Sequence, residues 1–149
     1  MLIRFWGTRG SIPVALTGAG VIMLEIVGAR IAGPVFGVSL YIWTALIAVT
    51  LLSLAVGYWL GGILCDLCPR TDAMYGVIAA AAVLSGAIGW IDGPVLAGCY
   101  SALGLRLGVL ASALVLFGPT LTLLGMVAPF ALKLALADLS RTGRTAGVL

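Results

Sequence analysis

The sequence predicts an all-α protein, a polytopic membrane helix bundle with about four transmembrane helices. Of its 149 residues, 62% are hydrophobic and only 9% are charged, and the mean hydropathy is +1.24. A soluble domain carries about 25% charged residues, so the expected solvent of this chain is the lipid bilayer. Long uncharged runs recur along the chain, and about 20 apolar helical residues cross a hydrocarbon core.

The longest uncharged run covers 35 residues, from Ile31 to Cys65, and predicts a span over residues 39–65. Aromatic side chains mark both of its ends, with Trp43 near the start and Trp59 near the finish. At the helical rise these two residues are about 24 Å apart, which suits aromatic belts at two membrane interfaces. Ser53, Gly57 and Gly61 recur every four residues and are candidate helix-packing residues, because a GxxxG face admits close approach of another helix.

The first predicted span covers residues 14–30 and carries Glu25 with Arg30 near its end. Five positions are a poor spacing for an ion pair within one helix, where three or four are needed. Two interpretations stay open. Glu25 and Arg30 are candidate contacts for a substrate or cation, or both are hydrated near a membrane interface. We expect Gly33, Pro34 and Gly37 to end this helix.

The segment after the second span reads GILCDLCPR over residues 62–70. Gly62, Asp66 and Arg70 are a candidate clamp between helix ends, through charge-assisted hydrogen bonds. Cys65 and Cys68 form a CxxC pattern, but without a second pair it is better explained as small residues at a helix end than as a metal site.

Two further spans are predicted, over residues 73–91 and 107–132, with a turn at residues 92–94. Residues 95–105 form either an interfacial helix or the start of the last span. Gly118 and Pro119 lie near the middle of that span and indicate either a packed kink or a broken helix at a transport site.

The basic residues predict the orientation of the chain. If residues 1–13 form a cytosolic tail and residues 14–149 a membrane domain with four spans, six cations lie on the cytoplasmic side: Arg4, Arg9, Arg70, Lys133, Arg141 and Arg144. Only Arg30 and Arg106 lie on the other side, so the positive-inside rule places both termini of this multi-pass protein of the cell membrane in the cytoplasm. The net charge of +3 is explained by orientation, and we expect the bilayer, not nucleic acid, as partner.

The chain contains no histidine, which excludes histidine metal sites and Ser-His-Asp triads. Its few carboxylates show no paired acid/base arrangement. We therefore expect no catalytic residues, no metal and no cofactor in these 149 residues.

Five sequence patterns follow one another after Gly18. They are LEI at residues 24–26 with Arg30, FGVSLY at 36–41 with Trp43 and Thr44, GYWLGG at 57–62 with Asp66, LGMVAP at 124–129, and GRTAG at 143–147. In this order they resemble the membrane portion of spermidine synthase-like proteins, a family of fused major-facilitator-like/spermidine synthases. The resemblance implies a major-facilitator-like half-bundle. It also implies a soluble aminopropyltransferase-like domain as partner, which these residues do not contain.

The function implied is a membrane module that anchors a polyamine aminopropyltransferase-type domain or passes substrate to it. Two alternatives stay open: a small transporter or channel subunit that works as a homo-oligomer, and a truncated membrane protein without activity of its own. Residues 1–13, MLIRFWGTRGSIP, resemble the start of metallo-β-lactamase-fold hydrolases. The activity of those enzymes is not carried over, because their metal ligands are histidines.

Overall fold

The computed structural model describes the backbone of residues 11–37, 39–67 and 70–146, and the side chains of residues 12–37, 39–67 and 70–133. These ranges contain three helices, α2 (Ser11–Phe36), α3 (Leu40–Leu67) and α4 (Thr71–Ala146), and no strand. The all-α prediction is therefore confirmed. Each helix also contains a segment long and apolar enough to cross a membrane, as expected for a membrane protein.

Helix α2 is longer at both ends than the predicted span of residues 14–30. It begins at Ser11, inside the predicted tail, of which residues 1–10 lie outside the described ranges. It continues through Gly33 and Pro34 to Phe36, so the predicted break at these two residues is wrong. A proline so near the end of a helix removes only one late hydrogen bond. The third residue expected to end the helix, Gly37, does follow its last residue; its φ of 84° is typical of a glycine cap, and its N–H donates to the Gly33 carbonyl at 2.9 Å.

Helix α4 includes both of the predicted spans over residues 73–91 and 107–132. The predicted turn at residues 92–94 is wrong, because helical structure continues through Pro94. The non-helical backbone inside α4 lies at Gly104, with φ 70° and ψ −168°, a conformation open essentially only to glycine. We call residues 71–103 the first arm and residues 105–146 the second arm.

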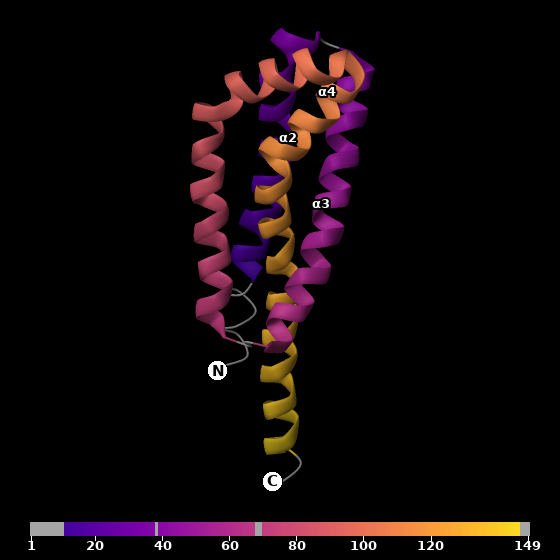
Figure 1. Ribbon diagram of the computed structural model, residues 1–149. Coiled ribbons are helices and arrows are strands. Elements are labelled where there is room, and N and C mark those ends of the chain that lie inside the picture. Colours follow the sequence, from indigo (N-terminus) through magenta and orange to yellow (C-terminus); the bar gives the residue numbers. More distant parts are fainter. Residues whose placement is uncertain (1–10, 38, 68–69, 147–149) are drawn as a thin grey trace.

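The two arms of α4 fold back on each other. The apolar part of α4 covers 63 residues, Thr71–Lys133, and a straight helix of that length would measure about 95 Å, three times the thickness of a hydrocarbon core. Figure 1 shows the first arm rising along one side, crossing the end of the bundle, and the second arm returning beside α3. Residues 95–103, for which an interfacial helix was one interpretation, belong to the helical structure that precedes Gly104.

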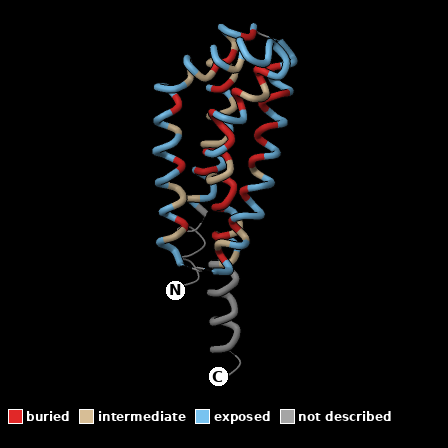
Figure 2. The backbone as a smooth tube through the Cα atoms, in the orientation of Figure 1, coloured by how far each residue is buried: buried red, intermediate tan, exposed pale blue. Residues whose placement is uncertain are grey.

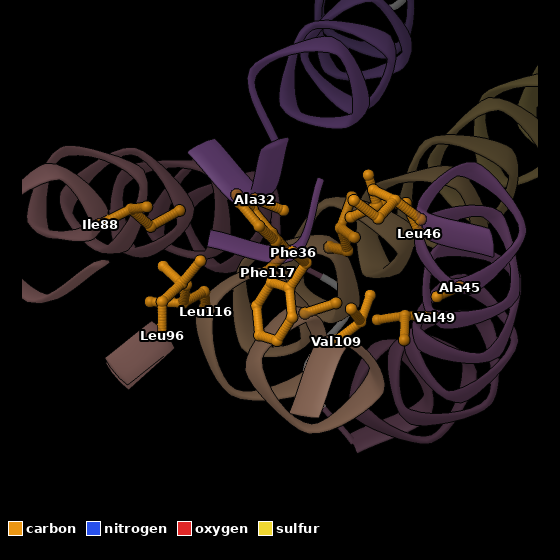
Figure 3. Close-up of a cluster of buried hydrophobic side chains, with 13 residues drawn as sticks. Ala32, Phe36, Ala45, Leu46, Val49, Ile88, Leu96, Val109, Leu116 and Phe117 are labelled. Carbon is orange, nitrogen blue, oxygen red and sulfur yellow. The ribbon is translucent and has the colours of Figure 1, made fainter. Parts of the chain in front are cut away.

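Residues from all three helices share one apolar core (Figure 3). Its members are Ala32, Phe36, Ile42, Ala45, Leu46, Val49, Ile88, Leu96, Val109, Ala113, Leu116, Phe117 and Leu121. A second cluster joins the C-terminal end of α3 to both arms of α4 through Cys65, Met74, Val127 and Phe130. Because Met74 of the first arm packs with Val127 and Phe130 of the second, the arms run antiparallel.

The outer surface of the bundle is apolar as well. Buried positions face the interior and exposed positions the outside (Figure 2), yet large hydrophobic side chains are exposed on every helix, including Leu40 at 86% and Trp90 at 89%. Exposure of such an apolar surface to water is unfavourable, whereas lipid tails solvate it. The exterior therefore supports the membrane location independently of helix length.

Candidate functional site

The packing face predicted on α3 lies against the second arm of α4. Ser53, Gly57 and Gly61 are all buried. A Cβ atom on Gly57 would overlap the carbonyl oxygen of Thr122, and one on Gly61 would lie 2.7 Å from the Cα atom of Met126. The two backbones are in direct contact here, so these positions leave no room for a side chain.

The second arm contributes glycines of its own to this contact. A Cβ atom on Gly125 would lie 3.3 Å from the Cα atom of Gly57, and one on Gly118 would lie 3.6 Å from Oγ of Ser53. Gly118 and Pro119 lie inside a helix that is continuous at that point. The non-helical backbone inside α4 lies at Gly104, so the broken-helix interpretation of Gly118 and Pro119 is wrong.

Asp66 forms an ion pair with Lys133 of the second arm. The Lys133 ammonium also donates to the backbone carbonyl of Cys65 at 3.2 Å. The last carbonyls of a helix have no partner within it and carry partial negative charge. Lys133 therefore satisfies one of these carbonyls and neutralises a carboxylate at the same helix end.

The clamp predicted from Gly62, Asp66 and Arg70 differs from the one in the structure. Arg70 is exposed, and among the side chains described no ion pair joins it to Asp66. A Cβ atom on Gly62 would meet nothing within 4 Å. The partner of Asp66 that sequence reasoning missed is Lys133, although two features of the sequence pointed to it. It is the first charge after the uncharged run of residues 107–132 and was placed on the same side of the membrane as Asp66.

The structure does not bring Glu25 and Arg30 into one pocket. Glu25 is half-buried and Arg30 is exposed, and no ion pair links them within the described part of the chain. Arg30 lines a groove of about 540 Å³ where α2 turns into α3. We call it the α2–α3 groove, and its other walls include Ile26, Ala29, Ser39, Ile42 and Trp43. Glu25 does not line it.

A second cavity, of about 430 Å³, lies between α2 and the first arm of α4. Its polar groups are hydroxyls, from Thr17, Tyr75 and Ser85, and the rest of its lining is apolar. No charged residue is among its described lining residues, so it offers no counter-ion for a cationic substrate.

The described residues contain no cluster of three histidine, cysteine, aspartate or glutamate side chains that would hold a metal ion. Cys65 is buried and Cys99 half-buried, each as a free thiol. Cys68, the other half of the CxxC pattern, lies outside the described residues, as do the side chains of Arg141 and Arg144.

Comparisons with protein-family models, with curated protein sequences and with solved structures found no match to this chain.

Proposed function

We propose that this chain is the integral membrane module of a spermidine synthase-like protein and that it serves to anchor an aminopropyltransferase-type domain. The observation that carries the membrane part is the lipid-compatible exterior around a packed interior. The synthase part rests on the five ordered sequence patterns. Two of these patterns include residues that pack at the α3–α4 contact. Gly57 and Gly61 belong to GYWLGG, and Gly125 belongs to LGMVAP.

In this proposal the chain crosses the membrane four times, because each arm of α4 makes a crossing of its own. Two cations, Arg70 and Lys133, belong to the end of the bundle where α3 finishes. Arg30 and Arg106 belong to the other end, where the Tyr41 hydroxyl donates to the Arg106 carbonyl at 3.0 Å. The sequence adds Arg4 and Arg9 before the first span and Arg141 and Arg144 after the last, and this topology assigns them to the Lys133 end. With six cations against two, the positive-inside rule assigns that end to the cytoplasm.

Cysteine labelling in intact cells tests this topology. The native cysteines are first replaced by serine, and single cysteines are introduced as Thr71→Cys at one end and Ser101→Cys at the other; both positions are exposed. We expect a membrane-impermeant maleimide to label the second variant from outside and the first only after permeabilisation. Labelling of both variants from the same side would overturn the four-pass topology.

A role in passing substrate to the synthase domain is a narrower proposal that rests on Glu25. A carboxylate inside a span is costly unless it is paired, and a polyamine ammonium would pair with it. We expect Glu25→Gln to abolish spermidine binding measured by equilibrium dialysis, with Asp72→Asn, an exposed carboxylate at the start of α4, as the unaffected control. Binding that is unchanged in the Glu25 variant would leave the anchoring role alone.

The oligomeric transporter is the weaker alternative. The sequence offers two GxxxG faces for contacts between copies, Gly57 with Gly61 and Gly104 with Gly108. The chain itself fills the first face, and a Cβ atom on Gly108 would lie 3.0 Å from the Cys99 carbonyl oxygen of the same chain. An oligomer would therefore need a different surface, and a monomeric mass by light scattering in mild detergent would count against it.

A further inference from the structure

The α2–α3 groove has the size and the chemistry of a ligand site. Its volume of about 540 Å³ falls within the range of about 300–1,000 Å³ typical of small-molecule sites. Ile26, Ala29, Ile42 and Trp43 make it apolar along its walls, while Arg30 supplies a positive charge and Ser39 a hydroxyl. A ligand that matches both features has a hydrocarbon part and an anionic part.

The position of the groove indicates where this ligand comes from. Both of its walls belong to helices whose exteriors are apolar, so in a membrane-embedded chain the groove borders lipid. Its lining includes Gly37 and Ser39, between the two helices, and Trp43, which is 43% exposed. Exposed tryptophan at the end of a span is typical of the headgroup level.

The positive charge of Arg30 favours an anionic ligand at the headgroup level. The guanidinium stays protonated in proteins and presents a fork of donors that fits two oxygens of a phosphate. No carboxylate in the described part of the chain forms an ion pair with it. A phosphate group that arrives with the surrounding lipid would satisfy these donors without any further protein residue.

We propose that the α2–α3 groove binds one anionic phospholipid, with the phosphate on Arg30 and an acyl chain along Ile26 and Ala29. Ser39 offers a second donor to the headgroup, and Trp43 covers the glycerol region. This inference needs the chain to lie in a membrane but not the synthase association, so either can fail without the other.

Native mass spectrometry of the full chain, released from detergent micelles after titration with phosphatidylglycerol or phosphatidylcholine, tests the proposal. We expect the unaltered chain to retain one phosphatidylglycerol in preference to phosphatidylcholine. Arg30→Gln should weaken phosphatidylglycerol retention about tenfold, because hydrogen bonds to charged groups are the strong ones. Arg30→Lys should lose less, since it keeps the charge and gives up only the fork geometry.

Two further variants separate this site from general effects. Arg106→Gln removes an exposed cation from the same end of the bundle without touching the groove, and should leave retention unchanged. Ile26→Trp fills part of the groove from a position that is 48% exposed and leaves every charge in place; it should lower retention as well.

Circular dichroism and gel filtration establish that each variant is folded. If Arg30→Gln does not fold, lipid retention by Ile26→Trp tests the proposal. Equal retention of the two lipids by the unaltered chain overturns the proposal. So does an equal loss in the Arg30→Gln and Arg106→Gln variants, or full retention by Ile26→Trp.

Discussion

Lys133 and Asp66 form an ion pair that joins the second arm of α4 to the C-terminal end of α3. The same ammonium group donates to the Cys65 carbonyl, so a single side chain makes two connections to residues that lie 67 and 68 positions earlier in the sequence. Below this pair, Val127 and Phe130 are fully buried against Cys65. The charged contact thus lies at the end of a packed apolar contact and fixes the register between the two helices.

The ion pair should contribute little to stability by itself. The Lys133 side chain is 42% exposed and that of Asp66 is 76% exposed, and exposed pairs contribute about 0–1 kcal/mol. We expect Asp66→Asn to lower the free energy of unfolding by less than about 1 kcal/mol in mixed micelles. Lys133→Met should cost more, because it also leaves the Cys65 carbonyl without its donor.

A double-mutant cycle between Asp66 and Lys133 should give a favourable coupling energy that shrinks at high salt. The matched cycle between Asp66 and Arg70 should give none. A larger coupling to Arg70 than to Lys133 would contradict the arrangement in the structure.

Two adjacent glycines on α3 should respond in opposite ways to alanine. A Cβ atom on Gly61 would lie 2.7 Å from the Cα atom of Met126, whereas one on Gly62 would meet nothing within 4 Å. We expect Gly61→Ala to destabilise the bundle by about 1–3 kcal/mol through overpacking. Gly62→Ala should be neutral or slightly stabilising, because alanine is the better helix former. Equal effects in reversible unfolding would show that the α3–α4 contact is looser than described.

The fold-back of α4 should depend on the glycine at position 104. Its backbone conformation costs any other residue about 1–3 kcal/mol, so we expect Gly104→Ala to destabilise the protein by that amount. Gly98→Ala is the matched control, since Gly98 is helical and open to the surroundings. Thermal unfolding followed by circular dichroism distinguishes the two. An unchanged midpoint for Gly104→Ala would exclude this backbone conformation.

Buried side chains should contribute to the free energy of unfolding through packing rather than through transfer from water. Phe130 is 0% exposed and Leu132, two positions on, is 63% exposed. We expect Phe130→Ala to destabilise by about 1–3 kcal/mol, less than the 3–5 kcal/mol of a soluble core, because the unfolded chain also stays in an apolar solvent. Leu132→Ala should change the free energy of unfolding by less than about 0.5 kcal/mol. Similar losses for both variants would mean that Phe130 is not enclosed.

The features that followed from the sequence are those that depend on local composition. Uncharged length predicted apolar helices, and small residues at a four-residue spacing predicted a packing face at Gly57 and Gly61. Features set by distant partners were missed. Pro34 and Pro94 signal breaks, yet both lie inside helices, and the non-helical position is Gly104, which no neighbouring turn residue marks.

The candidate site shows the same division. Asp66 was identified correctly as a charge at a helix end, but its partner was sought four residues away at Arg70. Lys133 reaches it only because the second arm returns along α3. Arg30 was a candidate substrate or cation contact, with hydration near an interface as the alternative. The groove beside it is lined by residues of both α2 and α3, and no local pattern brings these together.

The close contact between α3 and the second arm of α4 also has a consequence for biosynthesis. Residues 105–133 leave the ribosome after α2 and α3, and they carry the groups that meet Gly57 and Gly61. Helices α2 and α3 therefore enter the bilayer before their main partner exists, and lipid covers their interior faces until it arrives. Translation of the second arm thus completes the α3–α4 contact, and an insertase or chaperone that holds α2 and α3 would act on this protein before that step.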